Sequence, residues 1–334
     1  MKACVLLSNN HLEYKEIENP TVKDDEVLVK IITCGICSSD FNRVYKNGAY
    51  FYPIVLGHEF SGIIIKCGKN INNKYINKKV VVFPLLPCGE CEFCNKKMYA
   101  QCKNYKYFGS RCNGAMAEYI SVPFWNIKII PDNMSCTIAA LTEPCAVAIH
   151  TINKIKDIQN KKICISGSGT IGILCGLIAK SKGAEVTYIL RNNKKSKLLD
   201  ELGLDYFIQS TEKSFNIAIE CVGTNSSINN CIKYVKSKGE IILVGNPTSD
   251  MNLEKTIYWK ILRSELIISG VWNSSYKNQE SDDWDSAIDF LFKHSTIAEK
   301  IITKKFKLSD GINAFNEIKD STQVFLKGVF QNEE

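Results

Sequence analysis

The sequence predicts a two-domain α/β protein, in which a doubly wound parallel sheet is inserted into a β-rich domain. Residues 1 to about 145 read as short β patterns broken by Gly, Pro and Asn. From Lys162 to Trp272, apolar β-branched runs alternate with helical segments, which is typical of a parallel sheet covered on both faces. The 334 residues are also many for a single core. We therefore expect one domain from residues 1–145 and 273–334, and a second from residues 146–272.

The expected elements follow from local periodicity. In the first part, residues 26–32 have strand composition, and residues 80–83 read as a short buried strand that ends before Pro84. In the inserted part, strands are expected at 163–166, 185–190, 217–221, 240–244 and 266–271, with helices at 170–182 and 226–237. An amphipathic helix at 284–293 and a β-rich tail at 323–330 complete the chain.

Composition excludes several classes of protein. Hydrophobic residues make up 45% and charged residues 23%, as in ordinary soluble proteins. The net charge is +7, but the basic residues are scattered, which argues against a nucleic-acid partner. An odd number of cysteines, 15, without a secretory signal argues against a disulfide framework. The longest uncharged stretch is too short and too rich in glycine to cross a membrane. We expect a cytoplasmic protein.

Four cysteines at close spacing predict a structural metal site. Cys88, Cys91 and Cys94 are separated by two residues each, and Cys102 follows. Thiolates at this spacing can face one tetrahedral Zn²⁺, and four of them leave no position open for a substrate. We expect a zinc lobe at residues 84–103, in preference to four scattered core cysteines or a redox pair.

A glycine-rich turn predicts a dinucleotide site. Residues 162–172 read as a strand, then Gly-x-Gly-x-x-Gly, then the start of a helix. The first glycine permits the turn, the second lets a pyrophosphate approach the backbone, and the third lets helix and strand pack closely. The helix N-terminus then offers free N–H groups to the phosphates. The residues expected to bind the cofactor are Gly167, Gly169, Thr170, Ile171, Gly172, Leu190, Arg191, Val222 and Val244.

The end of the second strand bears on the choice between NAD and NADP. An NAD site usually has an acidic residue there to bind the ribose 2′-hydroxyl. Here Leu190 occupies that place, and Arg191 begins a basic cluster. Arg191 would attract a 2′-phosphate, so NADP is favoured over NAD. The alternative is a solvated basic turn in a lysine-rich protein.

Three further residues have the chemistry of a catalytic metal site. Cys37, His58 and Glu143 offer a thiolate, an imidazole and a carboxylate. Three protein ligands with a fourth position open is the pattern of catalytic zinc. Taken singly, His58 could be a core histidine and Glu143 a carboxylate at a helix start. Distance along the sequence cannot join them.

A family resemblance joins these residues. Cys-x-Ser-Asp at 37–40, Gly-His-Glu at 57–59, the four-cysteine lobe, Glu-Pro at 143–144 and the glycine turn stand in the order seen in zinc-dependent medium-chain dehydrogenases. The chain resembles the polyol branch of that family. Longer stretches resemble dehydrogenases of polyol phosphates such as galactitol 1-phosphate: residues 46–49, 52–53, 84–88, 108–111 and 260–266.

The resemblance implies a GroES-like catalytic domain, a Rossmann domain, two Zn²⁺ per chain, and NAD or NADP. It implies that Cys37, His58 and Glu143 bind the catalytic zinc, that Glu59 neighbours the metal and can replace Glu143 or water, and that Ser39 begins a proton relay. Relatives are commonly homodimers or homotetramers. Many of them have a histidine where this chain has Asn42, and Gly-Lys where this chain has Lys327-Gly328. We therefore transfer no role to Lys327.

The resemblance also implies the substrate. Arg43 stands where polyol dehydrogenases often have a tyrosine, and a guanidinium can bind a phosphate through two hydrogen bonds. Lys46 and Arg111 are two further cations expected near the same phosphate, although each alone could be a solvated surface residue. We expect oxidation of a polyol phosphate. The alternative is an unphosphorylated polyol or diol, such as sorbitol or 2,3-butanediol.

Functions of two other classes account for fewer of these residues. A zinc finger that binds nucleic acid would explain the four cysteines and the positive charge, but it leaves Cys37, His58, Glu143 and the glycine turn unexplained. A catalytically dead relative is disfavoured by the complete set of zinc ligands and by Ser39. A metal count separates them, because only the enzyme requires two Zn²⁺ per chain.

Overall fold

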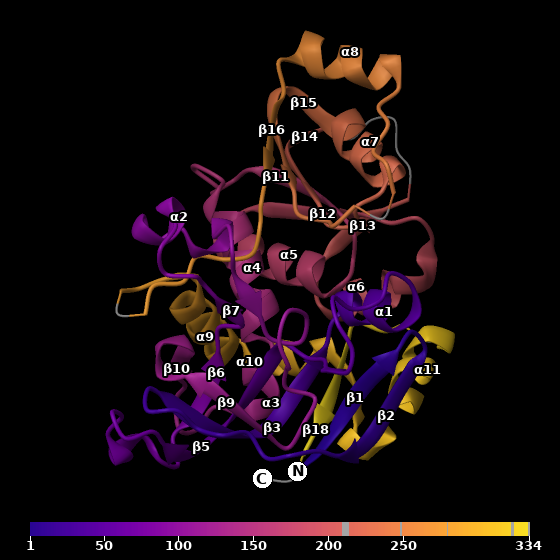
Figure 1. The fold of residues 1–334 in the computed structure, drawn as a ribbon. Coiled ribbons are helices and arrows are strands. Elements are labelled where there is room, and N and C mark those ends of the chain that lie inside the picture. Colours follow the sequence, from indigo (N-terminus) through magenta and orange to yellow (C-terminus); the bar gives the residue numbers. More distant parts are fainter. Residues whose placement is uncertain (209–213, 248, 279, 322–323, 333–334) are drawn as a thin grey trace. The chain divides into compact units, whose positions relative to one another are not determined.

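The computed structural model describes residues 1–334 except 209–213, 248, 279, 322–323 and 333–334 (Figure 1). Contacts within the chain divide it into two compact units. Unit 1 comprises Met1–Glu143 and Ser275–Glu334, and unit 2 comprises Pro144–Ser274. The predicted fold class, a β-rich domain with an inserted parallel sheet, is confirmed.

Unit 1 is built on a seven-stranded and a three-stranded sheet. The larger has the order β10-β6-β5-β3-β18-β17, with β9 also paired to β3, and the smaller has the order β2-β1-β4. The strands are β1 (Lys2–Ser8), β2 (His11–Glu16), β3 (Glu26–Ile36), β4 (Ile54–Val55), β5 (Glu59–Cys67), β6 (Lys79–Val82), β9 (Tyr119–Pro123), β10 (Ile127–Ile129), β17 (Ile302–Phe306) and β18 (Lys327–Gln331).

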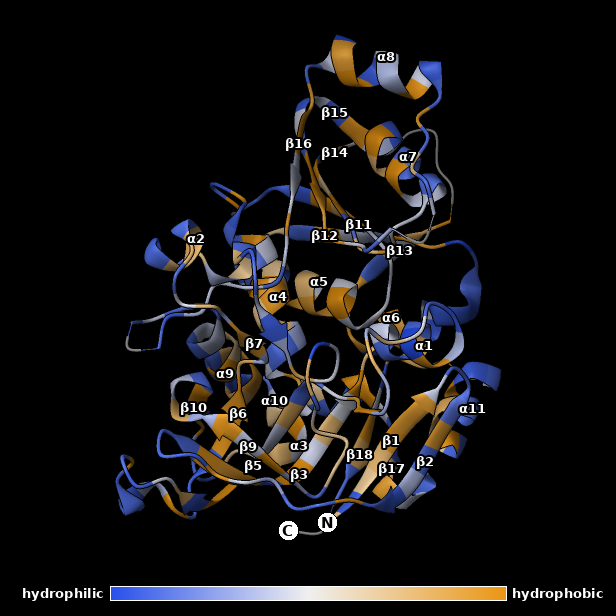
Figure 2. Cartoon of the chain, in the orientation of Figure 1, coloured by the Kyte–Doolittle hydropathy of each residue, from blue (hydrophilic) through white to orange (hydrophobic). Residues whose placement is uncertain are grey.

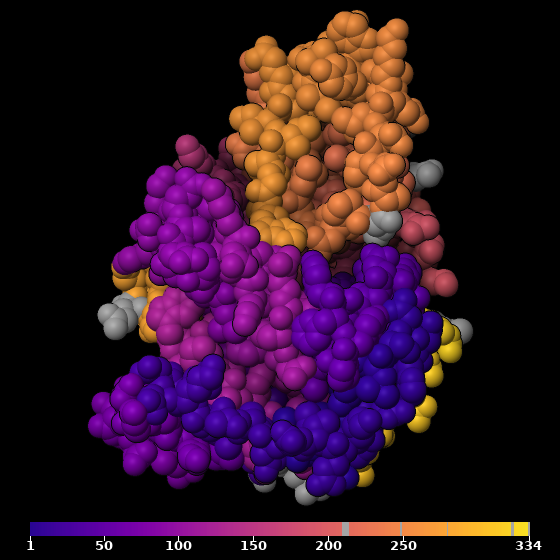
Figure 3. Space-filling model, in the orientation of Figure 1, coloured from indigo at the N-terminus to yellow at the C-terminus, as the bar shows by residue number. Residues whose placement is uncertain are grey.

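Strand β3 is the long central strand of this sheet and runs further than its composition predicts. It pairs with β5, β9 and β18, and its second half is buried without interruption from Ile31 to Ile36. Through this pairing the end of the chain lies beside its beginning, as the yellow β18 beside the indigo β3 shows in Figure 1. Indigo and purple segments from the first third of the chain, together with the magenta segment that follows, form most of the surface of unit 1 on the side drawn in Figure 3.

Short helices complete unit 1. They are α1 (Ser38–Tyr45), α2 (Glu92–Asn95), α3 (Cys136–Ala139), α9 (Asp283–Lys293), α10 (Ser295–Ile301) and α11 (Ile312–Asp320), and α4 (Thr142–Asn153) begins in unit 1 and continues into unit 2. The four-cysteine segment is an excursion flanked by β7 (Leu85–Leu86) and β8 (Lys106–Tyr107), which pair with each other.

Unit 2 contains a six-stranded sheet in which every pairing is parallel, in the order β13-β12-β11-β14-β15-β16. The strands are β11 (Lys162–Ser166), β12 (Glu185–Ile189), β13 (Asp205–Phe207), β14 (Phe215–Glu220), β15 (Val235–Leu243) and β16 (Ile267–Gly270). The helices are α5 (Thr170–Ser181), α6 (Ser196–Glu201), α7 (Asn225–Tyr234) and α8 (Lys255–Ser264). Central strands and α5 are strongly apolar (Figure 2), as expected of a sheet covered on both faces.

The structure corrects one predicted helix and, within unit 2, contains elements for which no range was expected. The helix expected at 226–237 ends at Tyr234, and the β-branched Val235 instead starts β15 by pairing with Phe215. The short β13 and α6 and the largely exposed α8 were not predicted. In the expected tail, β18 begins at Lys327, whereas Gln323 lies outside the described residues. Among the helices of the described residues, none has the length and hydropathy that a membrane-spanning segment needs.

Candidate functional site

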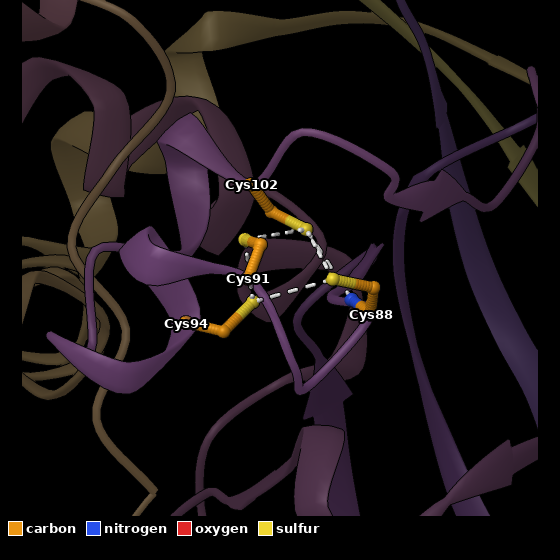
Figure 4. Close-up of side chains that lie close together, drawn as sticks. All are labelled: Cys88, Cys91, Cys94 and Cys102. Atoms are coloured by element: carbon orange, nitrogen blue, oxygen red, sulfur yellow. Dashed lines mark hydrogen bonds between the residues drawn. The ribbon is translucent and has the colours of Figure 1, made fainter.

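The four lobe cysteines converge on one point (Figure 4). The Sγ–Sγ distance is 3.9 Å for the pairs Cys88–Cys94 and Cys91–Cys102. It is 3.5 Å for the pairs Cys91–Cys94 and Cys88–Cys102. A tetrahedron with Zn–S bonds of about 2.3 Å has edges of about 3.8 Å. All four thiols are free. The donor geometry therefore fits a closed tetrahedral Zn²⁺ site.

The backbone of the lobe turns the loop at Gly89 and donates hydrogen bonds to the Cys91 thiol. Gly89 has φ +81°, a conformation that side chains rarely adopt, and it turns the loop between the first two cysteines. Backbone N–H groups of Lys103 and Cys94 donate to Cys91 and lower the pKa of its thiol to about 6. A thiol with this pKa is largely ionised at neutral pH, and the thiolate is the form that binds zinc.

A second donor group lies at the end of β3 and the start of β5. Ligand atoms of Cys37, His58 and Glu59 all lie within 4.8 Å of one another. Cys37 is the N-cap of α1, and Glu59 begins β5 beside Gly35 of β3. A Cβ on Gly35 would lie 2.4 Å from a Glu59 carboxylate oxygen, so glycine at this position makes room for that carboxylate.

The charges around His58 favour a cation. Burial opposes protonation, but Asp40, Cys37 and Glu143 outweigh it and raise the pKa of His58 to about 10. His58 Nδ1 is buried without a hydrogen-bond partner among the described residues. The His58 imidazole is therefore surrounded by acidic and thiol groups and has a ring nitrogen without a partner, which suits a divalent metal. A set made of a thiolate, an imidazole and a carboxylate suits Zn²⁺ in particular.

Glu143 lies near this group but outside the three atoms that converge. It is in the first turn of α4, and its carboxylate accepts a hydrogen bond of 3.0 Å from Tyr107 Oη. The Tyr107 ring packs edge to face with the His58 ring at 5.6 Å. Burial raises the pKa of Glu143, while His58 acts in the opposite direction. The structure thus brings the Glu59 carboxylate to the ligand atoms of Cys37 and His58, and it ties the Glu143 carboxylate to Tyr107, whose ring packs on His58.

Lys327 is a residue of this site to which sequence reasoning assigned no role. It is buried in β18, and its ammonium donates to Glu59 Oε1 at 2.8 Å, Glu59 Oε2 at 2.6 Å and the Ile36 carbonyl at 3.2 Å. Burial lowers the pKa of a lysine, but Glu59, Cys37 and Glu143 together raise the pKa of Lys327. The only sequence signal was a lysine in an otherwise apolar last strand.

Helix α1 carries the other polar groups of the site. Asp40 is fully buried, and its carboxylate accepts from the Cys37 backbone N–H at 3.0 Å and from Arg43 Nη1 at 3.1 Å. The same Arg43 nitrogen donates to Ser39 Oγ at 2.9 Å. Asp40 Oδ1 also lies 3.8 Å from His58 Nδ1. One buried carboxylate therefore links the metal ligands to Arg43 and, through it, to Ser39.

A cavity of about 310 Å³ opens along this helix. It is lined by Ser39, Asn42, Arg43, Asn47, Gly48, Ala49 and Tyr50. This volume is within the range of sites that hold a small molecule. Lys46 is exposed and does not line the cavity. Arg111 lies over the ring of Tyr50, one of the lining residues.

The glycine turn of unit 2 has the geometry that its sequence predicts. Gly167 has φ +113°, and a Cβ on Gly172 would lie 1.9 Å from the Gly167 carbonyl oxygen. Those two glycines are therefore required by the turn and by the packing of α5. A Cβ on Gly169, the N-cap of α5, would meet nothing within 4 Å. Open space beside a helix N-terminus fits a pyrophosphate.

The other predicted cofactor residues lie at the carboxyl ends of the parallel strands. Leu190 follows β12 and is buried, Val222 follows β14 and is exposed, and Val244 follows β15. Thr170 and Ile171 form the first turn of α5. Ligands of open α/β sheets bind at this edge.

The basic cluster after β12 contains a contact that sequence reasoning missed. Lys195 Nζ donates to the carbonyl of Ser168, inside the glycine turn, at 2.7 Å. Burial lowers the pKa of Lys195. Arg191 is exposed and has no ion-pair partner in the described part of the chain. The cluster thus places one lysine against the turn and leaves Arg191 at the surface.

Comparisons with known proteins agree with this arrangement. The profile of the alcohol dehydrogenase GroES-like domain matches residues 23–132, and that of zinc-binding dehydrogenases matches residues 170–293. The chain is 32% identical to galactitol 1-phosphate 5-dehydrogenase of Escherichia coli K12, over 95% of this chain and 96% of that protein. It is 29% identical to D-arabitol-phosphate dehydrogenase of Enterococcus avium, over 94% and 93%. The crystal structure of galactitol-1-phosphate dehydrogenase from Escherichia coli superimposes with a TM-score of 0.92 at 31% identity, covering 99% of this chain and 100% of that one.

Proposed function

The chain belongs to the zinc-dependent medium-chain dehydrogenases, in their polyol branch, and is an oxidoreductase acting on CH–OH groups; from this premise we propose that it oxidises a polyol phosphate, galactitol 1-phosphate, to the keto-sugar phosphate. The observation that carries the proposal is the cavity along α1, which has Ser39 on its wall near the Cys37 donor and Tyr50 on its wall beneath the guanidinium of Arg111. The two curated relatives reported above both act on polyol phosphates by name.

The metal and the cofactor have residues fitted to hold them. Cys37 and His58 would hold a catalytic Zn²⁺ together with Glu59 or Glu143, and the four lobe cysteines would hold a second, so we propose two Zn²⁺ per chain. The glycine turn would hold the pyrophosphate of NAD or NADP. When bound, the catalytic zinc lowers the pKa of the substrate hydroxyl and the nicotinamide accepts hydride.

The chain's own residues handle the proton. Arg43 Nη1 donates to Ser39 Oγ, so this oxygen is already an acceptor and its own proton is free to point elsewhere. Ser39 Oγ can then accept the substrate proton while it passes its own to the next group. Asn42 lines the same cavity but cannot titrate, so the proton leaves through water or the ribose of the cofactor.

We propose NADP as the preferred cofactor. Leu190 presents no carboxylate to a 2′-phosphate, and the exposed Arg191 is available for it. Arg191→Ala is expected to raise the KM for NADP about ten- to a hundredfold, the size of a charge-assisted hydrogen bond, and to spare NAD. An equal loss for both cofactors, or a wild-type preference for NAD, would reverse this assignment.

We also propose that the protein is a homodimer, with a homotetramer as the alternative. We propose that it works in the cytoplasm, where thiols are kept reduced. The exposed edge strand β16 supports self-association, since an unpaired apolar edge invites pairing with another strand. None of the fifteen cysteines, all of which lie in the described residues, forms a disulfide, which suits a compartment that keeps thiols reduced.

A screen of polyols and polyol phosphates, followed by cofactor reduction, tests the function. Galactitol 1-phosphate is expected to give the highest kcat/KM, and Ser39→Ala is expected to lower kcat by about a hundredfold or more. The exposed neighbouring Ser38→Ala is the matched control. A wild-type preference for free sorbitol or a diol would establish the unphosphorylated alternative instead.

A further inference from the structure

The two arginines beside the cavity, Arg43 and Arg111, differ in whether a carboxylate pairs with them. The Arg43 side chain is largely buried, and its Nη1 is shared between Asp40 and Ser39. Asp40 is fully buried, so its charge is balanced by Arg43 at short range. A phosphate drawn to Arg43 would have to compete with this carboxylate.

Arg111 has no such partner. No carboxylate lies within ion-pair distance of Arg111 among the residues that the structure describes. Its guanidinium carbon lies 4.7 Å from the centroid of the Tyr50 ring and 4.5 Å from that of the Tyr105 ring. Within the described part of the chain its one side-chain hydrogen bond, from Nη2 to Tyr50 Oη, is long at 3.4 Å. Ring faces hold the flat cation by cation–π attraction and leave its N–H edge available.

The same tyrosines connect Arg111 to both ends of the substrate site. Tyr50 lines the cavity that Ser39 also lines. The Tyr105 ring lies 6.4 Å from the Tyr107 ring, and Tyr107 contacts both His58 and Glu143. This chain of rings sets Arg111 at a defined distance from the metal ligands. A binding group at a defined distance from the reacting carbon can select substrates by length.

We propose that Arg111, supported by Tyr50 and Tyr105, is the residue that recognises the substrate phosphate, and that Arg43 positions Ser39. This rests on the proposed function and divides between two arginines a role that the sequence suggested for both. Arginine is rare in this chain, with four arginines among the 42 basic residues. The variant Arg111→Lys keeps the positive charge but removes the flat, forked guanidinium, and it therefore tests whether that shape is required.

The test compares kcat/KM for galactitol 1-phosphate and galactitol in the wild type, Arg111→Met, Arg111→Lys and Arg263→Met. Arg263 is the matched control, because its guanidinium lies over the Trp259 ring at 5.0 Å in unit 2. Arg111→Met is expected to lower the preference for the phosphorylated substrate about ten- to a hundredfold, through a higher KM for galactitol 1-phosphate. Arg111→Lys should restore only part of it, and Arg263→Met should change nothing.

Inorganic phosphate provides a second readout that does not depend on the substrate. It should inhibit galactitol oxidation competitively in the wild type and much more weakly in Arg111→Met. A large wild-type preference that survives in Arg111→Met would overturn the role of Arg111. If the wild type uses both substrates equally, the proposed function is wrong. If inorganic phosphate also fails to inhibit the wild type, the anion site at Arg111 is wrong as well.

Discussion

The pair formed by Lys327 and Glu59 is the most consequential single contact of the site. Both side chains are nearly inaccessible, with 4% and 2% exposed, and the ammonium bonds both carboxylate oxygens. Charges buried in this way are costly unless they are paired. The lysine therefore supplies the opposite charge for a buried carboxylate that lies beside Cys37 and His58.

Removing one member of this pair should be far more damaging than removing both. Lys327→Met is expected to lower the free energy of unfolding by about 3–5 kcal/mol, because Glu59 would be left as an unpaired buried charge. The double variant Lys327→Met with Glu59→Gln should recover most of that loss. Urea unfolding of the zinc-loaded protein measures both. A single variant as stable as the wild type would contradict the pairing.

The four-cysteine lobe is the element whose stability depends most on its metal. Its secondary structure amounts to two-residue strands and a four-residue helix, too short to be stable alone. Between Cys88 and Cys102, only Cys94 and Cys102 are buried. Since the lobe has almost no apolar core, zinc affinity there is local folding energy.

The two metal sites should therefore respond differently to mutation. Cys91→Ser is expected to leave one Zn²⁺ per chain and to lower Tm or cause aggregation. Cys37→Ser should also leave one Zn²⁺, but it should abolish turnover while Tm stays close to that of the wild type. Metal analysis and calorimetry distinguish the two. Full stability and activity of the Cys91 variant would show that the lobe needs no metal.

Acid should release the lobe metal. Because the folded lobe lowers the pKa of Cys91 to about 6, this thiolate contributes fully above the pKa of an unfolded thiol, about 8.5, and the contribution is lost as the pH falls through 6. Zinc release into a chromophoric chelator should rise as the pH drops below about 6. A release curve flat from pH 7 to 5 would contradict the low pKa of Cys91.

At the scale of the whole molecule, the proposed self-association depends on the β16 edge of the unit 2 sheet. Among the residues that the structure describes, strand β16 pairs only with β15, and Ile267 and Ile268 are exposed on it. Tyr258 and Trp259 of the neighbouring α8 are exposed as well. An apolar edge strand with its backbone groups unpaired is a template for association.

A charge on this edge should dissociate the assembly. Ile268→Lys is expected to convert a dimer into monomers in sedimentation velocity, because a lysine at the edge opposes strand pairing. Ile65→Lys on β5 is the matched control, since Ile65 and Ile268 are equally exposed at 38%. If the wild type is itself monomeric, or both variants dissociate alike, β16 is not the interface.

The sequence by itself determined the features that depend on local spacing. The four lobe cysteines and the three glycines of the turn each lie within a short segment, where backbone geometry follows from residue type and separation. Apolar periodicity likewise determined the two-domain fold. The tertiary structure alone decided the pairing of Glu59 with Lys327, which are 268 residues apart, and the contact of Lys195 with Ser168. It also decided that Arg43 donates a hydrogen bond to Asp40, whereas Arg111 packs over the rings of Tyr50 and Tyr105. These contacts depend on strand order, register and side-chain direction, which arise from the packing of distant segments and leave no periodic signal in either segment.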